Sequence, residues 1–183
     1  MGNNEPLEVV YSTKLLGVIC SSNAKWEENT TYITKRATKK LWMLQRLKWI
    51  GADQEILLET YKLHVRTILE ECVPLWHSSL TIKDSNRLEK VQKMAFSIIL
   101  NNYNSYTKSL NILKEETLKS RRKILCLKFA KNCVKNPKHS NMFPQSSGPQ
   151  TRNKNTFQEY KYRTDRFFKS ALPYLIRLLN QNY

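Results

Sequence analysis

The sequence predicts a mainly α-helical fold: a helical bundle that follows a short N-terminal β-hairpin and precedes a C-terminal linker and helix. Apolar residues recur at helical spacing in the middle of the chain, β-favouring residues gather near its start, and a polar stretch separates off a last amphipathic segment. With 183 residues, 40% of them hydrophobic, the chain can bury one sizeable core. The predicted boundaries are 1–24 for the hairpin, 25–136 for the bundle, 137–160 for a flexible linker and 161–183 for the C-terminal helix.

The first 24 residues are typical of extended structure. A turn is favoured at Asn3-Asn4, and Thr13-Lys14 and Gly17 interrupt the β-favouring residues that follow. Those residues are Val9, Val10, Tyr11, Val18 and Ile19. A short hairpin is therefore expected here.

Three helices are predicted in the first part of the bundle. Gly51 is expected to end the first helix, Asp53 to cap the second, and Pro74 to stop the second by removing a backbone donor. Thr81 and Asp84 fit a capping box at the start of the third. The apolar stripes, which must face one another to leave water, are Ile33, Ala37, Leu41 and Leu44; then Leu57, Tyr61, Val65, Ile68 and Cys72; then Leu88, Val91, Ala95, Ile98 and Ile99.

Two further helices are expected at 107–114 and 118–136, followed by the linker. The linker contains Pro, Ser, Asn and Gln and few large apolar residues, so burial would not offset its ordering entropy. A last helix at about 165–179 is expected to dock through Phe168, Leu172, Leu175 and Leu179, with Pro173 causing a kink or a shorter helix.

The charge of the chain points to a polyanionic partner. Thirty-one Lys and Arg against fifteen Asp and Glu give a net charge of +16, and the excess lies in the bundle and the tail. Nucleic acid is the usual partner of so basic a protein, and a membrane surface is the less favoured alternative. No apolar run is long enough to span a membrane, and no signal-like segment follows Met1. We expect an intracellular protein, nuclear or cytoplasmic and not secreted.

Cationic side chains gather on one side of the first predicted helix, away from its apolar stripe. Lys35, Lys39 and Arg46 fall within about 40° of one another, with Arg36 and Lys40 alongside. No acidic residue occurs between Glu28 and Asp53, whereas an ordinary solvated helix face would pair its bases with acids. We predict phosphate-backbone contacts by this face. A secondary row, diluted by acids, is Lys83, Arg87 and Lys90, and Arg152 and Lys154 are expected to add contacts from the tail.

Trp42 and Trp49 lie seven residues apart and therefore on one side of the first helix. Aromatic side chains beside basic ones could stack on unpaired bases. Packing against a neighbouring helix is the commoner reason for this spacing, and it is the interpretation we favour.

The sequence offers no catalytic, metal-binding or cofactor-binding motif, and no small-molecule substrate is expected. The four cysteines have no C-x-x-C spacing; Cys126 and Cys133, two turns apart on one predicted helix, are expected to be small buried side chains. The three histidines are scattered. Asp53, Asp84 and Asp165 are widely separated, so the chain lacks the clustered carboxylates with which polymerases hold two magnesium ions.

Four segments, in order, resemble the thumb and C-terminal region of reverse transcriptases encoded by jockey-like non-LTR retrotransposons. They are TKLLGVICSSNAKW (13–26), VRTILEECVPLWHSSL (65–80), RLEKVQKMAFSIIL (87–100) and YRTDRFFKSALPYLIRLLN (162–180). The resemblance implies that Lys14, Leu15, Leu16, Gly17 and Val18 form the primer-grip hairpin at the end of the palm, and that residues 25 to about 100 form a thumb that closes on the minor groove of template–primer duplex.

The same resemblance implies that the catalytic aspartates of the polymerase would lie upstream of Met1. We therefore expect the isolated chain to be no enzyme, and its hairpin to be an exposed edge or poorly ordered because the palm sheet is missing. The expected partners are template–primer duplex or element RNA, and the missing palm. Two alternatives remain open: a free-standing basic DNA- or RNA-binding module, and a protein-interaction bundle whose charge keeps it soluble. Binding that falls steeply with salt would separate the first from the second.

Overall fold

The protein is mainly helical, as predicted, and begins with a two-stranded antiparallel hairpin. The structure is a computed structural model that describes residues 9–102, 105–146 and 156–182. Its elements are β1 (Ser12–Leu15), β2 (Val18–Ser21), α1 (Glu27–Trp49), α2 (Gln54–Tyr61), α3 (Thr67–Leu69), α4 (Val73–Trp76), α5 (Ile82–Leu100), α6 (Tyr106–Leu113), α7 (Leu118–Lys135), α8 (Asp165–Phe168) and α9 (Ala171–Asn180).

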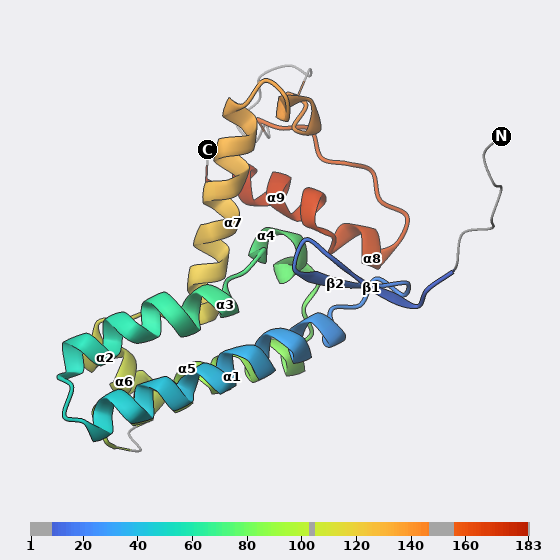
Figure 1. The fold of residues 1–183 in the computed structure, drawn as a ribbon. Helices are drawn as coiled ribbons and strands as arrows, with labels where there is room; N and C mark the ends of the chain where they lie inside the picture. Colours follow the sequence, from blue (N-terminus) through green and yellow to red (C-terminus); the bar gives the residue numbers. More distant parts are fainter. Residues whose placement is uncertain (1–8, 103–104, 147–155, 183) are drawn as a thin grey trace.

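The helices α1 and α5 lie side by side and run in the same direction, with α2 and α3 returning across α1 (Figure 1). At one end of the pair, Lys83 of α5 reaches Glu27 of α1 at 3.4 Å. At the other end, Lys48 of α1 donates to the carbonyl oxygen of Ile98 in α5. The helix α7 stands at an angle to this layer, α9 packs along it, and the short α4 contacts both α7 and α9.

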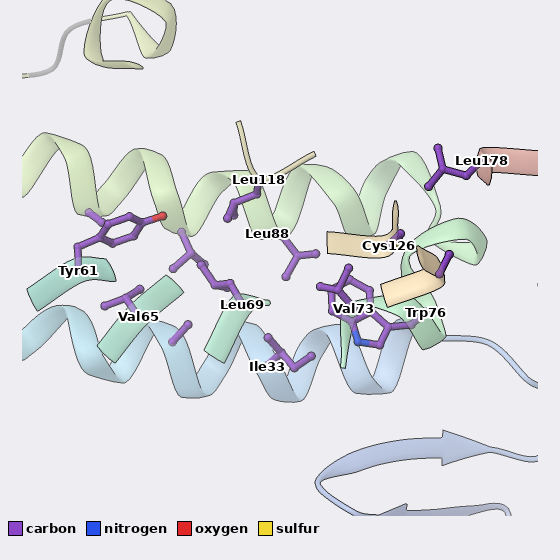
Figure 2. Close-up of a cluster of buried hydrophobic side chains, with 14 of the residues drawn as sticks. Ile33, Tyr61, Val65, Leu69, Val73, Trp76, Leu88, Leu118, Cys126 and Leu178 are labelled. Carbon is purple, nitrogen blue, oxygen red and sulfur yellow. The ribbon is translucent and has the colours of Figure 1, made fainter. Parts of the chain in front are cut away.

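One continuous core of buried side chains joins these layers. It includes Ile33 of α1, Leu88 of α5, Leu118 of α7 and Leu178 of α9, with Trp76 of α4 among them (Figure 2). The C-terminal helix therefore belongs to the same core as the bundle. The predicted stripes of α1 and α5 are confirmed, except that Ile98 is only half-buried. Phe96, which lies outside the predicted stripe of α5, is also fully buried.

Several predicted helix ends are confirmed by their backbone geometry. Gly51 follows α1 with a φ of 87°, the left-handed conformation that glycine adopts without strain. Thr81 caps α5: its hydroxyl oxygen accepts from the amide N–H of Asp84 at 3.1 Å and its hydroxyl lies 2.6 Å from the Asp84 carboxylate. Asp53 occupies the capping position of α2 but makes no capping bond with its side chain.

The apolar stripe of the second predicted helix was wrong from residue 68 onward. Leu69 and Val73 are fully buried, whereas Ile68 is half-buried and Cys72 is exposed. The cause is a π-helical segment, Lys62–Arg66, between α2 and α3. A π turn contains an extra residue, so the side chains beyond it move round the helix by one position. Cys72 then leaves the helix in the left-handed region, with a φ of 51°.

The C-terminal region is more ordered than its composition predicts. Residues 147–155 lie outside the described part of the chain, but the segments that flank them meet in a bridge between Gln145 and Phe157. Phe143 and Phe157 are buried, and the side-chain amide of Asn180 in α9 bonds both backbone groups of Phe157, at 2.9 and 3.0 Å. The described parts of the predicted linker, 137–146 and 156–160, therefore contact the core through Phe143 and Phe157.

The last predicted helix is divided into α8 and α9. The break falls at Lys169 and Ser170, and Pro173 lies in the first turn of α9 without kinking it. Proline is tolerated there because the missing N–H would have no partner within the helix. The prediction of a shorter helix is confirmed.

The hairpin is docked against the start of α1 through polar contacts. Its strands pair from Ser12 opposite Ser21 to Leu15 opposite Val18. The amide N–H of Ile19 donates to Oδ1 of Asn29 in α1 at 3.1 Å. All of β1 is exposed to solvent, so the expected exposed edge is present.

Replacing Thr81 by alanine should lower the free energy of unfolding by about 1 kcal/mol, because the capping bond to the α5 backbone is lost. Urea denaturation at neutral pH would measure the change. Thr38, which is exposed in the middle of α1, provides the control: Thr38→Ala should change stability by less than about 0.5 kcal/mol. Equal losses in both variants would contradict a specific capping role for Thr81.

Candidate nucleic-acid interface

The outer face of α1 carries four exposed cations: Lys35, Lys39, Lys40 and Arg46. The buried stripe of α1 lies opposite Lys35, Lys39 and Arg46, as the helical spacing predicted, whereas Lys40 lies at the edge of that stripe. Within the described residues, none of the three lysines forms an ion pair. Their charge is therefore directed to solvent and available to a phosphate backbone.

Arg36, the fifth residue predicted for this face, is half-buried and already engaged. Its guanidinium pairs with the carboxylate of Glu71 at 2.5 Å and lies over the ring of Tyr32 at 5.1 Å. The sequence showed no acid near Arg36 on α1, but the fold supplies one from the turn after α3. Arg36 thus joins α1 to that turn.

The secondary row on α5 is mostly paired with carboxylates. Lys83 lies 3.4 Å from Glu27, and Arg87 lies 3.5 Å from Asp84. Lys90 is exposed and forms no ion pair with a described residue. Since α5 lies beside α1, Lys90 adds to the cations of the same layer, while Lys83 and Arg87 are partly neutralised by their partners.

The two tryptophans of α1 are exposed, which contradicts the packing interpretation favoured from the sequence. Trp42 is 65% exposed and Trp49 is 79% exposed. Between them lies Arg46, whose guanidinium carbon is 5.8 Å from the Trp42 ring centroid and 5.5 Å from that of Trp49. Neither tryptophan contributes to the buried core.

The segment predicted to resemble a primer grip forms the turn of the hairpin. Leu16 and Gly17 occupy the turn with φ values of 47° and 91°. A Cβ at Gly17 would lie 3.1 Å from a carboxylate oxygen of Glu71, so this glycine permits both the turn and the close approach. Lys14 donates to the Tyr32 hydroxyl at 2.7 Å, which fixes the hairpin against α1.

Most of the other glutamates that contact cations connect helices within the fold. Glu70 pairs with Arg121 of α7 at 2.5 Å, and Glu115 pairs with Arg66 at 2.8 Å. Glu89 of α5 accepts from the Tyr106 hydroxyl and from two amides at the start of α7. These carboxylates pair with groups inside the fold and between helices. They are therefore not available to neutralise the exposed lysines of α1.

A half-buried histidine and a buried arginine lie where α4, α5 and α7 meet. Arg122 of α7 is 1% exposed and donates to Ser85 at 2.8 Å and to Nδ1 of His77 at 3.4 Å. The ring of His77 also packs edge-on against Tyr174 of α9. Burial, with the positive charges of Arg122 and Lys119 nearby, lowers the pKa of His77 to about 4. The imidazole is therefore neutral at pH 7 and serves as an acceptor that joins these helices.

The two predicted cations of the tail, Arg152 and Lys154, lie outside the described residues.

The remaining predicted features concern metal binding and membranes. Cys126 and Cys133 are buried, as predicted, and are free thiols. The described residues contain no cluster of three or more His, Cys, Asp or Glu side chains suited to a metal ion. Nor do they contain a helix with the length and apolar character needed to cross a membrane.

Comparison of the chain with protein-family models, with curated proteins and with solved structures found no match. The function of the chain is therefore inferred from its own sequence and geometry.

Acidification should destabilise the fold through His77. Its pKa is depressed in the folded state, so the unfolded chain binds a proton first as pH falls below about 6.5. Stability attributable to this residue is complete above that pH and is lost progressively down to pH about 4. We expect a loss of about 2 kcal/mol, discounted for the partial exposure of the ring. Urea denaturation at pH 7, 5.5 and 4 measures it.

The control is His77→Asn, which retains an acceptor for Arg122 but does not titrate in this range. Carboxylates elsewhere titrate equally in both proteins, so the difference between the two pH profiles isolates His77. Parallel profiles would show that this imidazole is not held neutral by its surroundings.

Proposed function

We propose that this chain is the nucleic-acid-binding thumb and C-terminal part of a retrotransposon RNA-directed DNA polymerase, and that it grips template–primer duplex with the outer face of α1. The observation that carries the proposal is the set of exposed cations on that face. Among the described residues, Lys35, Lys39 and Lys40 form no ion pair, in a chain whose net charge is +16. Sequence-tolerant binding to phosphates needs this arrangement and no base-specific contact.

The dimensions of the face suit a nucleic-acid backbone. From Lys35 to Arg46 the axis of α1 rises by about 16 Å, which corresponds to about five base pairs along the axis of a duplex. Because α1 is a straight element of 23 residues, its cations keep their spacing when the partner arrives. Lys90, which is exposed on the adjacent α5, adds one further cation to this layer.

The proposal also assigns a partner to the hairpin. The strand β1 is exposed throughout, and the side chain of Leu16 at the turn is 93% exposed. An exposed strand edge with apolar side chains is suited to pairing with another sheet. In the proposed polymerase, that sheet is the palm, which would bring the catalytic aspartates. The chain alone should therefore extend no primer in the presence of magnesium and dNTPs.

A free-standing basic DNA- or RNA-binding module would use the same face of α1 and stays the alternative. A protein-interaction bundle would not need this cationic face, because its affinity for a protein partner would not depend on phosphates. Salt dependence therefore separates nucleic-acid binding from protein interaction, and an affinity for primer–template hybrid above that for single strands favours the thumb.

Replacing Lys35, Lys39 and Lys40 together by glutamine should weaken binding to a primer–template hybrid without unfolding the protein. If each lysine contacts one phosphate, the slope of log K against log salt should fall by about 2.7, which is about 0.9 for each contact. Fluorescence anisotropy at several salt concentrations measures the slope, and thermal melting checks the fold.

The matched control is the triple change Lys108→Gln, Lys114→Gln and Lys128→Gln, which removes the same charge from exposed sites on or next to α6 and α7. It should alter the salt slope by less than half as much. If both triple variants weaken binding equally, the effect is one of net charge and α1 is not the interface.

A further inference from the structure

Two exposed tryptophans and an arginine form a continuous array on α1. We define this array as Trp42, Arg46 and Trp49. The guanidinium carbon of Arg46 lies within 6 Å of both indole centroids, at 5.8 and 5.5 Å. The other two tryptophans behave differently: Trp26 is half-buried and Trp76 is 1% exposed. Large aromatic side chains lose favourable burial when they are left in water, so an exposed pair on one helix face points to a ligand.

The array shares its face with the phosphate-binding cations. Lys39 lies one helical turn before Trp42, and Lys35 lies about one turn before Lys39. The nearest acids along the chain are Glu28 and Asp53, both outside this stretch. A ligand bound here must therefore present flat apolar rings together with negative charge.

We propose that the Trp42–Arg46–Trp49 array stacks on unpaired nucleotide bases, while Lys35 and Lys39 hold the phosphates of the same strand. This inference rests on the proposed function and deepens it: it names single-stranded nucleic acid next to the gripped duplex as the ligand. Indole rings stack on any base because every base has a π face, and the guanidinium plane adds a cation–π contribution.

The spacing of the array fits a single strand. Trp42 and Trp49 are separated by about 10 Å along the helix axis, which lets each indole stack on a different base of one strand. Bases within a duplex hide their faces against their neighbours, so only unpaired bases or a duplex end can use these rings. Tryptophan and arginine also dominate protein interfaces, but a stretch with four exposed cations and no acid favours a polyanion over a protein of ordinary charge.

The test compares Trp42→Ala/Trp49→Ala with the wild type on two probes: a 20-nucleotide single-stranded oligonucleotide and an abasic strand of the same length. The abasic strand keeps every phosphate and lacks the bases. We expect the double variant to bind the base-containing strand at least about tenfold more weakly and the abasic strand equally well, with an unchanged salt slope. Ile56→Ala, which removes an exposed apolar side chain from α2, should change neither affinity.

Quenching of the wild-type protein by acrylamide, a neutral quencher that phosphates do not repel, gives a second readout that needs no variant. The oligonucleotide should protect tryptophan fluorescence from acrylamide more strongly than the abasic strand does. Equal affinity of the double variant and the wild type for the base-containing strand would overturn the stacking assignment and leave duplex binding by the lysines intact. If the double variant differs from the wild type only in self-association, or only in binding to anionic lipid vesicles, the stacking assignment is wrong and the array binds a second copy of the chain or a lipid surface. A wild type that binds no nucleic acid at all would remove the proposed function as well.

Discussion

The fold depends on one short turn in which two successive glutamates reach in different directions. Glu70 pairs with Arg121 of α7, and Glu71 pairs with Arg36 of α1. The backbone oxygen of Glu71 also accepts from the indole of the buried Trp76 at 2.9 Å. This turn therefore connects the layer of α1 to the layer of α7 and α9. The Glu71 carboxylate also lies close to Gly17 in the turn of the hairpin. Because these two ion pairs and one hydrogen bond are partly shielded from water, they stabilise the fold more than fully exposed pairs would.

The same turn helps to explain why the surface is so basic. Carboxylates that connect helices cannot also neutralise exposed lysines. Glu89 satisfies two amides at the start of α7 and the hydroxyl of Tyr106, and Glu115 holds Arg66 between helices. Fewer acids than bases are present, and many of these acids are committed to internal contacts. Positive charge is therefore left unpaired where acids are missing, as along the outer face of α1.

Sequence patterns predicted correctly those features of the fold that depend on neighbouring residues in the chain. Helical spacing identified the buried sides of α1 and α5, and the Thr81 cap and the Gly51 stop were visible as residue types at the right offsets. The predictions that were wrong concern a local irregularity of one helix and the packing between distant segments. The π segment at Lys62–Arg66 has no composition signal and shifted the stripe by one residue. For Trp42 and Trp49, helical spacing shows that the two side chains share a face but not whether another helix covers that face.

The two ends of α1 explain how its outer face can act as a binding surface. At its start, Lys14 and Ile19 of the hairpin bond Tyr32 and Asn29; at its end, Lys48 reaches a carbonyl of α5. The helix is held at both ends and along its buried stripe, so little conformational entropy remains to be lost when a partner binds the opposite face. Side chains on that face contribute little to the core, and their replacement should affect binding far more than folding.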